Sequence, residues 1–391
     1  MSDAIRNEVE TWLARHWDSA NKRAVGTDTY DEKAWLEKVV DAGYATPTWS
    51  RDWYGLELKQ IDAQIIEKAF QKSRAPGWGR DRFHLGAITI YRMGGEALKT
   101  ELLRKLLIGP ICCLLYSEPG AGSDLAGIRT RAVKDGDEFV VNGQKVWTSN
   151  AQEADYGMLL TRTDMDVPKH QGITFFIFPM KQQGVEVRPI NQITGESEFN
   201  EVFITDARVP ERYIIGEYNQ GWTSFQGAIA SERLIMGMGI TARGGRSTKS
   251  KAPALLRLAH KHNRLKDPGL RQEIAQVLAH RQLNSLNMQR AIEEIKNNGM
   301  SSLMSLGKLS MSRIQHGEAR LSGVILGPNV LLDDTEDAQN ANFDAAKAYM
   351  NSIGGGTDQI QRNIIAERIL GLPKSNDADR SIPFKDVKTS S

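Results

Sequence analysis

Nine residues that begin at Tyr116 read Tyr-Ser-Glu-Pro-Gly-Ala-Gly-Ser-Asp, and their types suit the binding of an anionic or carbonyl-rich ligand. They follow an apolar run, Ile111 to Leu115, that is typical of a buried strand. The proline and the glycines predict a tight turn after that strand. Such a turn presents consecutive backbone N–H groups, together with the hydroxyls of Ser117 and Ser123, and few side chains that would keep a ligand away.

A second motif, Trp147-Thr-Ser-Asn150, follows about thirty residues later at the end of another strand-like run. Taken alone, Trp147 fits a core aromatic residue, and the glycine turn fits an ordinary surface loop. The two motifs at this spacing are far more specific than either part, and together they resemble the middle domain of the acyl-CoA dehydrogenases. Four further segments carry the same resemblance: 172–178, 199–203, 216–222 and 356–362.

The resemblance covers most of the chain and implies an α+β fold in three parts. These are an N-terminal helical domain over residues 1–110, a middle β-barrel or β-sandwich domain over 111–215, and a C-terminal helical bundle over 216–391. The residue patterns agree with that order, because apolar residues recur at helical spacing in the outer parts and short β-branched and aromatic runs alternate with turns in the middle.

Two dipeptides in the middle part, Asp135-Gly136 and Asn142-Gly143, predict hairpin turns. In the C-terminal part, Gly327-Pro328 and the acidic residues 333–342 predict a break between helices.

The resemblance also implies FAD as the cofactor, bound between the β domain and the C-terminal bundle. Residue by residue, the motifs carry over these flavin contacts: Leu114, Tyr116, Ser117, Gly122, Ser123, Trp147, Ser149, Thr357 and Gln359. Trp147 would pack beside the isoalloxazine ring, and Ser149 would hydrogen-bond to it. Ser123 would also lie near the acyl-CoA substrate.

One helical stripe after Gly221 contains a carboxylic acid. Its members are spaced four, three, four and four residues apart and share one helix face: Phe225, Ile229, Glu232, Met236 and Ile240. Desolvation on an apolar face raises the pKa of an acid, which suits a general base acting near neutral pH. The pattern alone favours another interpretation, in which Arg233 or another cation holds Glu232 at the helix edge as a structural ion pair.

The resemblance reverses that preference. Most members of the family carry the catalytic glutamate near the C-terminus in a Tyr-Glu-Gly-Thr run, where this sequence reads Gly-Gly-Gly-Thr and places Gly355 at the acid position. A second group carries the base on the helix after the β domain, just before an arginine, as Glu232 stands before Arg233 here. Glu232 is therefore the predicted catalytic base.

The implied reaction is the α,β-dehydrogenation of an acyl-CoA to a trans-2-enoyl-CoA. Glu232 would remove the α-proton, flavin N5 would accept the β-hydrogen as a hydride, and hydrogen bonds to the thioester oxygen would stabilise the developing charge. In the family these bonds come from the flavin ribityl hydroxyl and from the backbone N–H at the position of Gly355. Arg233 fits a contact to CoA and a salt bridge equally well. An electron-transfer flavoprotein would reoxidise the flavin.

Two family segments that reach a neighbouring subunit are missing. Residues 260–269 lack an Arg-x-x-Phe-Gly run, and residues 322–328 lack a His-Gly-Gly-x-Gly segment. The same losses are typical of actinobacterial acyl-CoA dehydrogenases that assemble from two different chains, several of which act on steroid side chains. We therefore expect the base-bearing subunit of a heteromer, such as a heterotetramer, that acts on a bulky or steroid acyl-CoA.

Two other interpretations stay open from the sequence. A flavin-dependent monooxygenase or oxidase of the same fold would use oxygen and would not need an acid on the apolar stripe. A partner subunit with an inactive site would not need both Glu232 and the two flavin motifs.

The composition argues against several other classes of protein. The 391 residues carry a net charge of +2, which gives no strong field for nucleic acid or membrane binding. No apolar run is long enough to span a membrane, and the N-terminus lacks the apolar core of a secretory signal. Cys112 and Cys113 are adjacent and fit small core residues of a protein in a reducing compartment. The seven histidines lack metal-ligand spacing, so the sequence predicts no metal. The missing signal and membrane span, together with the cysteines, predict a cytoplasmic protein.

Overall fold

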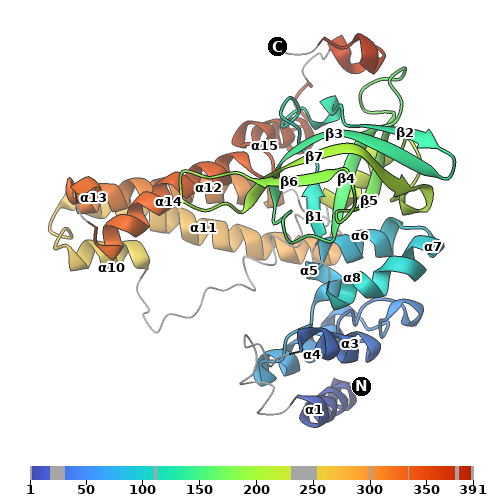
Figure 1. Cartoon of the computed structure of the whole chain (residues 1–391). Helices are drawn as coiled ribbons and strands as arrows, with labels where there is room; N and C mark the ends of the chain where they lie inside the picture. The colour runs from blue at the N-terminus through green and yellow to red at the C-terminus, as the bar shows by residue number, and fades with distance from the viewer. Residues whose placement is uncertain are drawn as a thin grey trace. The chain divides into compact units, whose positions relative to one another are not determined.

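The computed structural model describes residues 2–17, 31–109, 112–229, 253–298, 301, 303–332, 334–374 and 378–388 (Figure 1). The chain divides into two compact units. The first consists of Met1–Ile190, Ser197–Glu232 and Ala378–Ser391, and the second of Asn191–Glu196 and Arg233–Asp377. The division into three domains at residues 110 and 215 stays a prediction.

The first unit begins with short helices. They are α1 (Ser2–His16), α3 (Glu32–Asp41), α4 (Gln60–Ser73), α5 (Arg80–Phe83), α6 (Leu85–Met93), α7 (Glu96–Leu98) and α8 (Arg104–Ile108). The helical spacing of apolar residues in α1 is confirmed, because Val9 and Leu13 are buried. The Asp31 carboxylate accepts a hydrogen bond from the Ala34 N–H at 2.9 Å and so caps the first turn of α3.

The same unit contains one seven-stranded sheet. Its strands are β1 (Cys112–Leu115), β2 (Arg131–Asp135), β3 (Glu138–Ser149), β4 (Tyr156–Arg162), β5 (Ile173–Pro179), β6 (Val185–Pro189) and β7 (Phe199–Pro210). They pair in the order β1-β4-β2-β3-β7-β6, with β5 on β4, and β1 runs parallel to β4. The rings of Phe139 on β3 and Phe176 on β5 lie 5.2 Å apart although β4 and β2 separate these strands in the sheet. The sheet therefore curls, as its ribbon in Figure 1 shows, and aromatic rings pack inside the curl. This agrees with the predicted β-barrel or β-sandwich domain.

The two predicted hairpin turns have different outcomes. Asp135-Gly136 does join β2 to β3, and Gly136 has a φ of +67°. The prediction for Asn142-Gly143 is wrong, because both residues lie inside β3 at a shift of its register against β7. Asn142 exchanges two hydrogen bonds of 2.9 Å with Asp206 on β7, so its amide stabilises a β-bulge and not a reversal of the chain.

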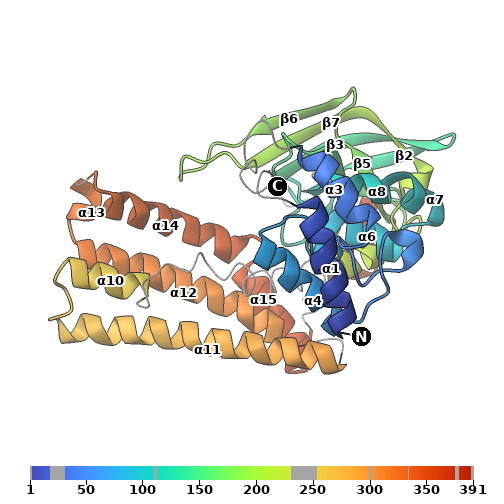
Figure 2. The same ribbon diagram turned by 90° about the horizontal axis from the view of Figure 1, so that it is seen from below.

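The second unit is a bundle of helices. They are α10 (Ala254–Lys261), α11 (Pro268–Asn298), α12 (Leu303–Leu326), α13 (Asn329–Leu332), α14 (Glu336–Ile353) and α15 (Asp358–Ile364). Helix α12 packs against α11 and α14, which run beside it in Figure 2. Buried aliphatic residues from several of the helices form its core: Leu255, Leu270, Ile274, Ile314, Leu321 and Ile325.

The predicted acidic break at residues 333–342 is too long. Helix α14 already begins at Glu336, where the hydroxyl of Thr335 accepts a hydrogen bond from the Ala338 N–H. The acids that suggested a break, Glu336 and Asp337, occupy the first turn, where negative charge stabilises a helix N-terminus. Among the described helices, none combines the length and the hydropathy needed to cross a membrane.

Candidate active site

The turn after β1 leaves its backbone open to an approaching group. Gly122 and Ser123 are exposed, and a Cβ atom added at Gly120 or Gly122 would meet none of the described atoms within 4 Å. The predicted flavin contacts just before the turn are half-buried: Leu114, Tyr116 and Ser117. The turn thus offers backbone and hydroxyl groups with little steric obstruction.

Trp147 presents its indole on the surface of the first unit. Its side chain is 60% exposed, which contradicts its interpretation as a core aromatic residue. The backbone has a φ of +61°, an unfavourable region for a bulky residue, at a place where the register of β3 against β7 shifts between Lys145 and Thr148. Ser149 is exposed next to it, whereas Thr148 is buried. Strained, exposed aromatic residues of this kind occur at ligand sites.

A buried ion pair connects the two motifs. The Lys145 ammonium is fully buried and donates hydrogen bonds to Oε1 of Glu118 at 2.8 Å and to the carbonyl of Tyr116 at 3.0 Å. Glu118 also accepts hydrogen bonds from the backbone N–H groups of Arg129 (2.6 Å) and Thr130 (2.9 Å). Burial raises the pKa of Glu118, but the charge and the hydrogen bond of Lys145, together with the two backbone donors, outweigh it and hold the pKa below its ordinary value.

A second buried cation supports the chain just after the turn. The Arg162 guanidinium donates to the carbonyl of Ala126 at 2.6 Å and lies 3.8 Å from the ring centre of Phe384. Phe384 belongs to the C-terminal segment 378–388, and its N–H donates to the carbonyl of Val167 at 2.8 Å. Burial lowers the pKa of Arg162 to about 10, which leaves the group charged at neutral pH.

The helical segment that begins at Gly221 is described through residue 229. Phe225, the first member of the predicted apolar stripe, is 2% exposed, and its ring lies 4.9 Å from that of Tyr116 in an edge-on contact. The stripe therefore starts against one of the predicted flavin contacts. Glu232 and Arg233, like the rest of the stripe beyond Ile229, lie outside the described residues.

The C-terminal part of the predicted site lies in the second unit. Gly355 has a φ of +66° in an exposed loop, and its carbonyl accepts a hydrogen bond from the buried amide of Gln361 at 3.4 Å. Thr357 caps α15, where its hydroxyl accepts from the Ile360 N–H at 3.2 Å. Gln359, two residues further on, is exposed. Gly355, Thr357 and Gln359 thus lie together in the loop before α15 and in its first turn.

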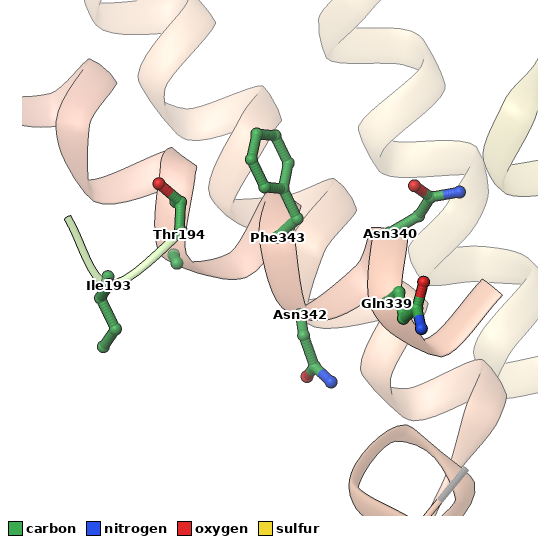
Figure 3. Close-up of a pocket in the computed structure, with 7 residues that line it drawn as sticks. Ile193, Thr194, Gln339, Asn340, Asn342 and Phe343 are labelled. Atoms are coloured by element: carbon green, nitrogen blue, oxygen red, sulfur yellow. The ribbon is translucent and has the colours of Figure 1, made fainter. Parts of the chain in front are cut away.

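A cavity of about 450 Å³ also lies in the second unit (Figure 3). Its lining consists of Ile193 and Thr194 on the loop 191–196 and of side chains along α14: Gln339, Asn340, Asn342, Phe343 and Ala346. Lys347 ties this loop to α14 through an ion pair of 3.1 Å with Glu196. The lining is neutral, and it contains no predicted site residue.

The structure thus brings together, within the first unit, the two motifs that the sequence predicts to bind flavin. Sequence reasoning missed the pair that joins them, Glu118 and Lys145. A signal was available, because Phe139, Val141 and Lys145 follow the period of two that puts residues on one face of a strand. Within the described ranges, no group of three or more His, Cys, Asp or Glu side chains could hold a metal ion.

Comparisons with known proteins agree with this geometry. Family models for "Acyl-CoA dehydrogenase, middle domain" and "Acyl-CoA dehydrogenase, C-terminal domain" match residues 113–207 and 219–370. The chain is 31% identical to acyl-CoA dehydrogenase IpdE1 of Mycobacterium tuberculosis, over 95% of this chain and 98% of that relative. A solved structure named Tcur3481-Tcur3483 steroid ACAD is similar with a TM-score of 0.69 and 26% identity, over 96% of this chain and 98% of the other. The ChsE4-ChsE5 complex from Mycobacterium tuberculosis shares the fold, with a TM-score of 0.65 and 24% identity over 96% and 98% of the two chains.

Proposed function

Because the chain belongs to the acyl-CoA dehydrogenase family of flavin-dependent oxidoreductases, we propose that it converts an acyl-CoA thioester into a trans-2-enoyl-CoA, with FAD as the flavin and Glu232 as the base. The observation that carries the proposal is the buried contact between Phe225 and Tyr116. Phe225 begins the stripe that is predicted to carry the acid, and Tyr116 follows β1 directly and is a predicted flavin contact.

The described residues fit a flavin. An exposed indole at Trp147 offers a flat apolar surface to a ring system, and the open turn at Gly122 offers backbone donors without a side chain in the way. The residues that would hold FAD are Leu114, Tyr116, Ser117, Gly122, Ser123, Trp147 and Ser149, with Thr357 and Gln359 from the second unit. When bound, the isoalloxazine ring supplies the acceptor for the β-hydrogen and its electron pair.

Glu232 takes the α-proton in this proposal. On the predicted helix it stands seven residues beyond Phe225, which corresponds to about 10 Å and to the same face. Apolar neighbours on that face disfavour the ionised carboxylate, raise its pKa towards neutrality and so make it a more effective base at physiological pH. Gly355, at the alternative acid position of the family, has no side chain that could accept the α-proton.

The remaining groups bind and polarise the substrate. The backbone N–H of Gly355 is our proposed donor to the thioester oxygen, where negative charge develops as the proton leaves. Its loop is held by the amide of Gln361 and by the cap at Thr357, which supports a fixed backbone donor. Ser123 and Arg233 complete the proposed contacts to the acyl-CoA.

We further propose that the chain works in a heteromer with a second acyl-CoA dehydrogenase-like chain and acts on a bulky or steroid acyl-CoA. Support comes from the missing segments at residues 260–269 and 322–328. Further support comes from the names of two similar structures, the Tcur3481-Tcur3483 steroid ACAD and the ChsE4-ChsE5 complex. An electron-transfer flavoprotein is the proposed electron acceptor.

The test uses the chain alone and co-expressed with candidate partner chains. Purified protein is analysed for FAD and is then assayed with a panel of acyl-CoA thioesters, including steroid ones, by dye-linked reduction and by oxygen uptake. Substituting Glu232→Gln should lower the reductive rate by about 10²–10⁴-fold while FAD stays bound. Glu217→Gln, an exposed acid on the segment before the helix, is the matched control and should not change the rate. Retention of more than about a tenth of the rate in Glu232→Gln would rule out this base, and stoichiometric oxygen uptake would favour an oxidase.

A further inference from the structure

A buried ion pair joins Glu118, in the turn after β1, to Lys145 on β3. The ammonium of Lys145 is fully buried on β3, and the Glu118 side chain is only 9% exposed in the turn after β1. The carboxylate has three donors, namely Lys145 and the N–H groups of Arg129 and Thr130. A buried charge pair with its hydrogen bonds made is stable as a pair, but it does not tolerate the loss of one partner.

The pair connects the backbone of both flavin motifs. Glu118 stands two residues after Tyr116, and Lys145 also donates to the carbonyl of Tyr116. The next residue, Val146, adds a third connection, because its N–H donates to the carbonyl of Ser117 at 3.0 Å. The root of the glycine turn is thereby fixed to β3 immediately before Trp147.

Trp147 occupies the strained position that these contacts support. Its φ of +61° is unfavourable for a bulky residue and persists only where the surroundings impose it. The register shift against β7 ends at Thr148, which is buried. The residues on both sides of Trp147 are thus held, and its indole is directed outward.

We propose that Glu118 and Lys145 are positioning residues for the flavin, and that their ion pair holds the glycine turn and the indole of Trp147 in the relative geometry that FAD binds. This inference rests on the proposed function, because it takes FAD as the ligand of both motifs. Neither residue touches the ligand in this proposal. Both act through the backbone, by removing conformations of the turn and of the bulge that could not bind a rigid ring system.

The experiment separates positioning from general stability. A double variant, Glu118→Gln with Lys145→Met, replaces the pair by neutral groups of similar size and leaves no unpaired buried charge. The single variant Lys145→Met leaves the carboxylate unpaired and is made for comparison. Lys134→Met is the matched control, since Lys134 on β2 forms a 2.6 Å ion pair with Glu211 in which both side chains are about half exposed.

Each variant is made in the full chain, with the partner chain wherever wild type needs it. The measurements are the dissociation constant of FAD from flavin fluorescence, the visible absorption envelope of the bound flavin, and the thermal midpoint of the apoprotein. The double variant should have a higher midpoint than Lys145→Met, which leaves a charge unpaired. It should bind FAD at least about tenfold more weakly than wild type and shift the envelope. Lys134→Met should match wild type in all three.

The outcomes are distinct. Failure of wild type to bind FAD, alone and with every partner tested, would overturn the proposed function itself. Binding of FAD by the double variant with wild-type affinity and an unchanged envelope would overturn the positioning role while the proposed function stands. A lowered midpoint with an unchanged envelope and affinity would show a merely structural pair and would overturn the positioning role as well.

Discussion

Replacing Trp147 by asparagine separates backbone strain from ligand binding. With a φ of +61°, the present residue carries about 1–2 kcal/mol of strain, which asparagine relieves because it tolerates this region. The indole is 60% exposed, so the protein covers roughly 100 Å² of it, worth about 2.5 kcal/mol at about 25 cal/mol per Å². The two effects oppose each other, and the free energy of unfolding should fall by only about 1 kcal/mol.

Urea denaturation of the apoprotein measures this change, and flavin fluorescence measures FAD binding in the same variant. We expect near-normal stability together with strongly weakened binding. Tyr218→Asn is the control, because Tyr218 is an aromatic residue of the same unit with a similar exposure of 45% and is not among the residues with positive φ. It should lose stability without a gain from strain relief and bind FAD normally. A loss above about 3 kcal/mol in Trp147→Asn would refute the strain, and unchanged FAD affinity would refute the contact.

Two further predictions concern the stability of the first unit. Phe225→Ala should lower the free energy of unfolding by about 3–5 kcal/mol, because a nearly buried ring against Tyr116 is lost, and a loss below about 1 kcal/mol in chemical denaturation would contradict that packing. Glu118 should make stability sensitive to acid. Burial raises the pKa of Glu118, but the larger opposite effect of Lys145 and the backbone donors leaves it below its ordinary value. The native carboxylate therefore binds a proton less readily than the unfolded one, whose pKa is about 4.3. Its contribution is therefore present above that pH and is lost as the pH falls through the native pKa. The double variant Glu118→Gln with Lys145→Met should flatten the pH dependence of unfolding in this range without leaving a buried charge unpaired, and an unchanged slope would count against the pair.

The sequence was most informative where residue type and spacing decide the local structure. The short strands of the β domain, the buried apolar residues of α1 and the turn at Gly122 follow from hydrophobic periodicity and from glycine chemistry. The curling of the sheet was implied by the family resemblance alone. Asn142-Gly143 shows the limit of such rules. The same dipeptide serves a hairpin or a β-bulge, and the choice depends on Asp206, a partner 64 residues away.

The partner of the buried Lys145 could not be chosen from the sequence, for a related reason. The alternation along β3 puts Lys145 on the buried face, and a buried ammonium needs an anion. Many acids in the chain could satisfy that need, and only the packing of β1 beside β3 selects Glu118, 27 residues earlier. Long-range pairing of charges is a property of the topology.

The backbone at Gly355 bears on where the base can stand. Its φ of +66° lies in the region that would cost a glutamate about 1–2 kcal/mol. Gly356 follows with a φ of +90°, and a Cβ atom there would lie 3.0 Å from the amide nitrogen of Gln361. A loop of this kind can bring a backbone N–H close to a thioester, but it has no side chain that accepts a proton. In the proposed reaction the base therefore has to come from another element. We propose the helix after Gly221, because Phe225 in its first turns packs against Tyr116, one of the predicted flavin contacts.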